Sequence, residues 1–407
     1  MCGISARFLI SLVLLTCFTG TVAVPAFGEE IRIPVCEDQP VFDLPENEGM
    51  ALLREMKTGW NLGNTFDAYD DTGWYRGPQA EMETIWGNPA TTRGMIQQVY
   101  DAGFRTLRLP VSWHNHVDDR DQIDPAWLSR VREVAGWALE LGMYVIVNTH
   151  HDNQQAFYYP TEEFMPRSEA YLTSVWTQLA EAFRDCDEHL ILEAMNEPRL
   201  VGTAWEWSWS AESEACLEAA DCINRLNQLF VDTVRATGGG NATRYLAVPS
   251  YAANGWNACE DAFRLPEDPA GRVILSVHAY IPYSFALDTS SSDATFSDRE
   301  EWKKEEIARL MNLLYDHFVS RGIPVLLDEY GALEKNGHLQ DRVNFAAWYT
   351  ACASVRGITC CWWDNGLLQG NGERFGLLNR KEGKWVYPKI VQAIMKNCLI
   401  HREEGEI

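Results

Sequence analysis

The stretch Leu190-Ile191-Leu192-Glu193-Ala194-Met195-Asn196-Glu197-Pro198 shows a pattern that recurs along the chain. In each case a short apolar run ends in polar residues, and in this stretch a proline follows at once. Seven other segments are also nearly continuous runs of aliphatic and aromatic residues, which are typical of strands buried on both faces of a parallel sheet. The predicted strands cover residues Lys57–Gly63, Phe104–Val111, Tyr144–His151, Leu190–Glu197, Tyr245–Tyr251, Val273–Tyr280, Pro324–Tyr330 and Ile358–Trp363.

Amphipathic helical segments lie between most of these strands. In residues 125–141 apolar side chains recur at helical spacing, and Gly142 follows as a C-terminal cap. Strands that alternate with helices predict an α/β fold, a (β/α)₈ TIM barrel that forms a single domain. The predicted helices cover residues Thr91–Asp101, Pro125–Leu141, Ser168–Asp185, Ala215–Ala236, Arg299–Arg321, Leu339–Val355 and Tyr387–Cys398.

Polar side chains gather where the predicted strands end. In barrel enzymes the carboxyl ends of the strands form one rim, and the active site is built there. A chance accumulation of polar residues at most of the strand ends is improbable, so we expect one site at this rim. The candidate residues are Arg108, His150, His151, Asn196, Glu197, His278, Tyr280, Glu329 and Trp363.

Two carboxylates at the rim, Glu197 and Glu329, are the candidate catalytic groups. Cleavage of a glycoside with retention needs two carboxyl groups about 5–5.5 Å apart, one to protonate the leaving oxygen and one to attack the anomeric carbon. Their pKa values must differ, because one starts protonated and the other ionised. We expect Arg108 and Tyr280 to hold Glu329, and His278 to tune the protonation of Glu197.

The other rim residues suit a sugar ligand, although a structural role remains open for any one of them. The Trp363 ring offers a stacking face, and the Asn196 amide can bind a sugar hydroxyl. Because side chains alternate along a strand, we expect at most one of His150 and His151 to point inward. Glu193, about 13 Å below Glu197 on the same predicted strand, is interpreted as a buried, paired carboxylate.

Composition limits the class of partner. The chain has 58 Asp and Glu against 34 Lys and Arg, a formal net charge of −24 that disfavours nucleic acid and anionic membranes. No zinc spacing, phosphate-binding loop or serine-hydrolase motif is present, and we expect no metal. Trp205, Trp207 and Trp209 lie in polar, loop-like sequence, where core packing and sugar binding are equally open.

The N-terminus has the pattern of a secretory signal peptide. Residues 8–24 are nearly all apolar, follow a basic residue and precede a small-residue cleavage site. We expect residues 1–26 to be the signal peptide, residues 27–47 an N-terminal extension and residues 48–400 the barrel of a secreted protein. A threonine before Cys17 argues against lipid anchoring at that cysteine.

The number of cysteines limits the disulfides. Of 11 cysteines, Cys2 and Cys17 fall in the signal segment, which leaves nine. An odd number means that at least one has no partner within the chain. Cys216 and Cys222 are close in sequence and are candidates for a bridge.

The ordered set of motifs resembles glycoside hydrolase family five, the large cellulase family, over nearly all of residues 50–395. The run Glu83–Pro89 also resembles subfamily four, the branch of endoglucanases, xyloglucanases and lichenases. The motifs are Gly59–Thr65, Leu107–Trp113, Asn148–His151, Met195–Pro198, Val277–Tyr280, Asp328–Gly331 and Trp363–Gly366.

The resemblance implies a retaining double displacement, with Glu197 as proton donor and Glu329 as nucleophile. It implies no cofactor. It further implies a binding shell in which His151 is an additional sugar contact beside Arg108, His150, Asn196, His278, Tyr280 and Trp363.

We therefore expect a secreted, endo-acting hydrolase of β-1,4-glucosidic bonds in cellulose-type glucans, with xyloglucan and mixed-linkage β-glucan as further candidate substrates. A β-1,4-mannanase is one alternative, because the residues that select the sugar cannot be identified from sequence alone. A glycan-binding barrel without activity is another, although the complete set of site residues argues against it. We expect a monomer without a nucleic-acid partner and without membrane contact beyond the signal peptide.

Overall fold

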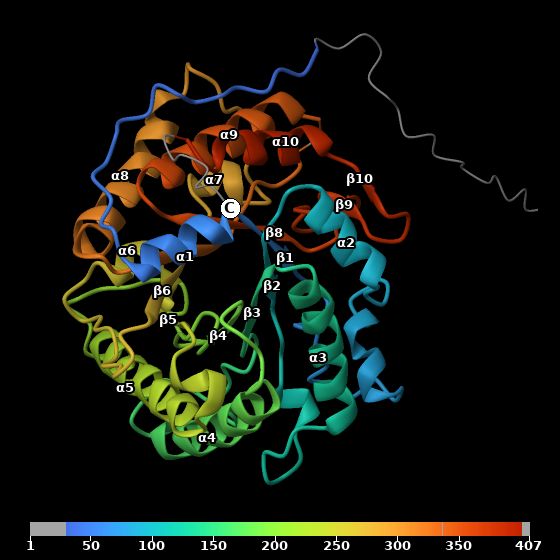
Figure 1. Cartoon of the computed structure of the whole chain (residues 1–407), viewed down its shortest axis with the longest axis vertical. Helices are drawn as coiled ribbons and strands as arrows, with labels where there is room; N and C mark the ends of the chain where they lie inside the picture. Colours follow the sequence, from blue (N-terminus) through green and yellow to red (C-terminus); the bar gives the residue numbers. More distant parts are fainter. Residues whose placement is uncertain (1–29, 336, 401–407) are drawn as a thin grey trace, which may run out of the picture. The chain divides into compact units, whose positions relative to one another are not determined.

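A closed barrel of eight parallel strands is the centre of the computed structural model, which describes residues 30–335 and 337–400 (Figure 1). Neighbouring strands pair in chain order, and β8 pairs with β1 to close the barrel. Each predicted strand overlaps one of these, so the predicted barrel is confirmed. The strands are β1 (Gly59–Leu62), β2 (Thr106–Leu109), β3 (Tyr144–Asn148), β4 (Leu190–Glu193), β5 (Leu246–Asn254), β6 (Val273–His278), β7 (Val325–Tyr330) and β8 (Thr359–Asp364).

Helices surround the strands in Figure 1, and a small antiparallel sheet of β9 (Leu378–Asn379) and β10 (Lys384–Trp385) follows β8. Among the described residues, no helix combines the length and apolar character needed to cross a bilayer. The α-helices are α1 (Glu48–Met56), α2 (Arg93–Asp101), α3 (Pro125–Glu140), α4 (Met165–Ala182), α5 (Glu214–Ala236), α6 (Gly255–Ala258), α7 (Tyr283–Ala286), α8 (Glu301–His317), α9 (Leu339–Val355) and α10 (Pro388–Asn397). Short 3₁₀ helices are η1 (Gln79–Thr84), η2 (His114–His116), η3 (Gly239–Ala242) and η4 (Val319–Arg321).

Helix α3 shows how the local sequence sets the element boundaries. The Asp124 side chain accepts hydrogen bonds from the backbone N–H groups of residues 126 and 127, and Pro125 occupies the first turn, where its missing N–H costs nothing. Trp127 and Val131 lie on the buried face. The chain then turns at Gly142 with φ of 73°, a left-handed conformation that glycine adopts without strain.

Several strands end earlier than predicted, and two of these early ends bear on the site. The ladder of β3 stops at Asn148 and that of β4 stops at Glu193, so His150, His151 and Glu197 lie in the loops that follow. These loops still bond across the rim, since the Asn196 N–H donates to the Thr149 carbonyl at 2.9 Å. The side chains of these loop residues therefore need not alternate between two faces, as they would in a strand.

The amino ends of the strands are covered by α1. The hydroxyl groups of Thr106 and Thr359, the first residues of β2 and β8, donate to the carbonyls of Met56 and Leu53. Residues 32–47 form neither helix nor strand and pack on the outer helices. The Cys36 N–H, for example, donates to the Asn397 side chain at 2.9 Å. The predicted signal peptide, residues 1–26, lies outside the described residues.

The suggested bridge between Cys216 and Cys222 is wrong. Both are free thiols on α5. Six residues along an α-helix correspond to a rotation of about 240°, so the two side chains leave the helix in different directions.

The close approach of β1 to β8 gives a test of the barrel packing. A Cβ atom built on Gly59 would lie 2.2 Å from the Sγ atom of Cys361, whereas one on Gly136 in α3 meets nothing within 4 Å. Gly59→Ala should lower the free energy of unfolding by about 1–3 kcal/mol through overpacking. Gly136→Ala, the matched control, should raise it by about 0.5–1 kcal/mol because alanine favours the helix. Denaturant titration measures both, and equal effects would contradict the packing described.

Candidate active site

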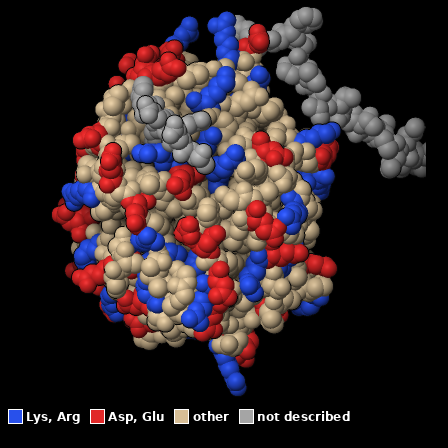
Figure 2. Space-filling view, in the orientation of Figure 1, with Lys and Arg blue, Asp and Glu red and all other residues tan. Residues whose placement is uncertain are grey.

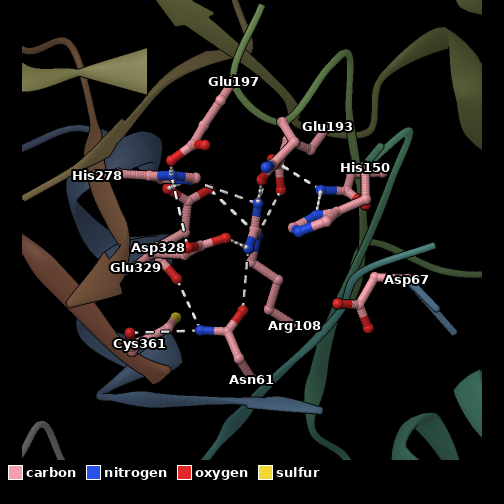
Figure 3. A network of polar contacts seen from close by, with 12 residues as sticks. Asn61, Asp67, Arg108, His150, Glu193, Glu197, His278, Asp328, Glu329 and Cys361 are labelled. Carbon is pink, nitrogen blue, oxygen red and sulfur yellow. Dashed lines mark hydrogen bonds and ion pairs between the residues drawn. The ribbon is translucent and has the colours of Figure 1, made fainter. Parts of the chain in front are cut away.

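Arg108 is the centre of a polar network at the rim of the barrel (Figure 3). Its side chain is fully buried on β2. Nε donates to one oxygen of Glu193 at 2.8 Å, and Nη2 donates to the other at 2.7 Å. The Nη1 group donates to Asn61 at 3.0 Å and to Glu329 at 2.5 Å, and Nη2 also donates to Asn196 at 2.7 Å. A guanidinium has five N–H donors, so every donor of Arg108 is used.

The two predicted catalytic carboxylates meet at this rim. Glu329 lies on β7, and Glu197 lies in the loop after β4. One oxygen of each carboxylate and a ring nitrogen of His278 lie within 4.8 Å of one another. A short separation is typical of retaining enzymes, whose two carboxyl groups lie about 5–5.5 Å apart. In inverting enzymes the two groups lie about 6.5–9.5 Å apart.

Glu329 is held from two sides. Arg108 donates to Oε1, and the Tyr280 hydroxyl donates to Oε2 at 2.9 Å. Burial and the charge of Glu329 raise the pKa of Tyr280 well above its usual range, so the phenol keeps its proton. These contacts confirm the expected positions of Arg108 and Tyr280 and orient both carboxylate oxygens.

Glu197 shares a proton with His278. Nδ1 of the imidazole lies 2.8 Å from Oε1 of the carboxylate. Burial lowers the pKa of His278, but the charge of Glu329 and the hydrogen bond to Glu197 outweigh it and raise that pKa to about 9. Burial raises the pKa of Glu197, but the bond and charge of His278 outweigh it and leave that pKa below its ordinary value. In the free protein the proton is therefore on His278, whereas the sequence suggested a protonated Glu197.

Both His150 and His151 line the cleft, so the expectation that at most one would point inward is wrong. The reason is the early end of β3, beyond which strand alternation no longer applies. The His150 ring stacks parallel to the Trp363 ring, with centroids 5.7 Å apart. Burial lowers the pKa of His150 well below its usual range, so this imidazole is neutral.

A cleft of about 760 Å³ opens above the network. Its wall includes the predicted residues Asn196, His278, Tyr280 and Trp363, together with both carboxylates. Trp207 also lines it with 65% of its surface exposed, and the Arg199 guanidinium lies 3.9 Å from the centre of the Trp207 ring. Trp209 instead packs on Tyr251.

Some of these atoms have the spacing of metal ligands. Nitrogen and oxygen atoms of Glu197, His278 and Glu329 form one such group, Asp67, His150 and His151 form a second, and Glu193, His278 and Asp328 form a third. In the first and third groups Arg108 lies beside the carboxylates of Glu329, Glu193 and Asp328, and its charge repels a cation. In the second, the Asp67 oxygens accept the N–H groups of residues 64 and 65. We assign no metal to any of the three groups.

The family model described as cellulase (glycosyl hydrolase family 5) matches residues 68–368. The chain belongs to glycosyl hydrolase family 5. A solved structure of a lichenase point mutant from Caldicellulosiruptor sp. F32, in complex with cellotetraose, is 47% identical with a TM-score of 0.89 and covers 91% of this chain and 100% of that one. A GH5-4 broad specificity endoglucanase from Ruminococcus champanellensis with bound cellotriose is 42% identical with a TM-score of 0.79, covering 87% and 100%.

Two curated relatives are also similar to this chain over most of its length. Endoglucanase B of Ruminococcus albus is 40% identical over 370 residues, which cover 91% of this chain and 85% of that protein. The cellulase/esterase CelE of Acetivibrio thermocellus is 40% identical over 383 residues, but this chain spans only 43% of its length.

Sequence reasoning missed three residues of this family 5 site. Arg199 donates to the Glu197 carbonyl at 2.9 Å and lies 3.6 Å from its carboxylate, and its place directly after Asn-Glu-Pro was the available signal. Glu373 lines the cleft from the loop after β8. Asp328 was quoted only as part of a motif, yet it is fully buried inside the network.

The Arg108 network gives a second prediction. Arg108→Met leaves buried Glu193 without its partner and should lower the free energy of unfolding by about 3–5 kcal/mol. Arg93→Met is the matched control, because the Arg93 side chain is 59% exposed in its pair with Glu140. An exposed pair contributes about 0–1 kcal/mol. Denaturant titration compares the variants, and a similar loss in both would show that Arg108 does not hold the network together.

Proposed function

We propose that this chain is an endo-acting, retaining β-1,4-glucanase in which Glu329 is the nucleophile and Glu197 the acid/base. The observation that carries the proposal is that one oxygen of Glu197 and one of Glu329 lie within 4.8 Å of each other. Glu329 is fixed by Arg108 and Tyr280, and Glu197 is bonded to a protonated His278. The roles follow from these different surroundings, since the nucleophile needs an anchored carboxylate and the acid needs a proton source.

In the first step a sugar ring stacks on Trp363, and an Asn196 N–H group binds one of its hydroxyls. The Asn196 oxygen already accepts from Arg108, which leaves its NH₂ for the ligand. The proton of His278 passes from Nδ1 to Oε1 of Glu197 and from there to the glycosidic oxygen. Glu329 attacks the anomeric carbon as the bond to the leaving sugar breaks, which gives a glycosyl ester.

In the second step a water molecule takes the place of the leaving sugar. Glu197, now a carboxylate, accepts a proton from this water, and the hydroxide attacks the anomeric carbon. The ester bond to Glu329 breaks and restores its carboxylate. Two displacements at one carbon retain its configuration.

The cleft supports a polymeric substrate that is cut internally. Trp207 and Trp363 both line it, and sugars bind aromatic faces through their C–H groups. The 47% identity to a lichenase and the 42% identity to a broad specificity endoglucanase support glucans, including mixed-linkage β-glucan, over mannan. On the face drawn in Figure 2, acidic and basic side chains are interspersed over the described part, without an extended basic area of the kind that binds a polyanion.

The test is a comparison of initial rates on carboxymethyl cellulose, lichenan, xyloglucan and mannan. We expect reducing ends from the glucans at higher rates than from mannan. Glu329→Gln should lower the rate by about 10³-fold or more, a loss of about 4 kcal/mol in transition-state stabilisation.

Glu188→Gln is the matched control, since Glu188 is exposed at the opposite end of β4 and should leave the rate unchanged. Full activity of Glu329→Gln would exclude the assigned nucleophile. A wild-type protein that cleaves mannan and no glucan would overturn the substrate assignment.

A further inference from the structure

Asp328 is a buried carboxylate that the two-step reaction does not use. It precedes Glu329 on β7, and strand alternation would point the two side chains to opposite faces. Both nevertheless lie beside Arg108, at 3.6 Å for Asp328 and 2.5 Å for Glu329. The register of β7 is irregular against both β6 and β8 at this point, and such irregularities redirect side chains.

One oxygen of Asp328 is committed and the other is not. Oδ2 accepts from the Ser276 hydroxyl at 2.8 Å. Oδ1 is buried and has no hydrogen bond within the part of the chain that the structure describes. It lies 3.4 Å from Nε2 of His278, on the side of the ring away from Glu197 (Figure 3).

The partner of Nε2 can be found by elimination. Nη2 of Arg108 lies 3.5 Å from it, but both Nη2 hydrogens already go to Glu193 and Asn196 at 2.7 Å. Because His278 is protonated, Nε2 carries a hydrogen of its own, and a guanidinium has no atom that could accept it. The unpaired Oδ1 of Asp328, 3.4 Å away, is the acceptor that the geometry offers. A hydrogen bond at one imidazole nitrogen decides which tautomer the other nitrogen presents.

We propose that Asp328 is a positioning residue that accepts Nε2–H of His278, so that Nδ1 is the atom that exchanges a proton with Glu197. The three side chains form a carboxylate–imidazole–carboxylate relay from the barrel interior to the cleft. This inference rests on the proposed acid/base role of Glu197. No group is oxidised or reduced, because a single proton moves between Nδ1 and Oε1.

The relay has a defined effect on pH dependence. Burial and the charge of Glu193 raise the pKa of Asp328 to about 7, so Asp328 is ionised above that pH, in the range where His278 loses its proton. The anion beside Nε2 stabilises the imidazolium and extends proton donation to more alkaline pH. The other titratable or charged groups that face His278 and Asp328 are Arg108, His150, Glu193, Glu197, Tyr280, Glu329 and Cys361.

The first experiment is the pH profile of kcat/KM on a soluble mixed-linkage β-glucan. Asp328→Asn keeps the shape of the side chain and removes the charge, so the alkaline midpoint should fall by roughly one pH unit or more. Asp364→Asn is the matched control, because it makes the same change at a fully buried carboxylate that bonds Trp60 and Gly366. Its alkaline midpoint should stay at the wild-type value.

The second experiment does not depend on turnover. NMR titration of histidine-labelled protein, with the His278 signal assigned by its loss in His278→Gln, should show His278 deprotonating at lower pH in Asp328→Asn than in the wild type. Asp328→Ser is the substitute if Asp328→Asn does not fold. It removes the charge without placing an amide beside Arg108, and it should lower the pH at which His278 deprotonates in the same way.

The outcomes separate the two proposals. If His278 deprotonates at the same pH in a folded Asp328 variant as in the wild type, the relay is overturned, even when the wild-type enzyme cleaves glucan. A wild-type protein that cleaves no glucan overturns the proposed function. A lower His278 deprotonation midpoint in the Asp328 variant, measured by NMR, would still support the contact between Asp328 and Nε2.

Discussion

The site depends on the complete use of the Arg108 donors. Four carboxylates, those of Glu193, Glu197, Asp328 and Glu329, lie around Arg108 and His278 at the rim. Buried charges of one sign repel one another and lose their hydration, so such a group is stable only when cations and hydrogen bonds compensate it. Arg108 supplies one charge and five donors, and His278 supplies a second charge when it is protonated.

The same donors fix the positions of the groups around the proposed catalytic pair. The acceptors of Arg108 come from β1, β4 and β7 and from the loop after β4, so a single side chain connects strands that lie apart in the sequence. Closure of β8 on β1 brings these strands into one ring. The reacting groups themselves lie at the ends of the strands or just beyond them, where they can reach the cleft while their neighbours stay fixed in the ladder.

The fold and most of the site could be predicted because apolar runs end in polar residues at the rim. The orientation and protonation of particular residues could not be predicted. The inward position of both His150 and His151 depends on where the β3 ladder stops. The contact of Asp328 with Arg108 and His278 depends on the irregular register of β7. The proton on His278 results from the sum of several charges brought together by folding, which no local pattern records. Arg199 and Trp207 meet through a loop whose path the sequence does not specify.

The central claim is that two carboxylates at short separation carry out two displacements at one carbon. The most direct measurement is the anomeric configuration of the first product, recorded by proton NMR in the minutes before mutarotation during digestion of a soluble β-glucan. The account predicts that the β-anomer of the new reducing end accumulates first. Initial accumulation of the α-anomer would contradict it, because inversion requires a single attack by water between carboxylates set farther apart.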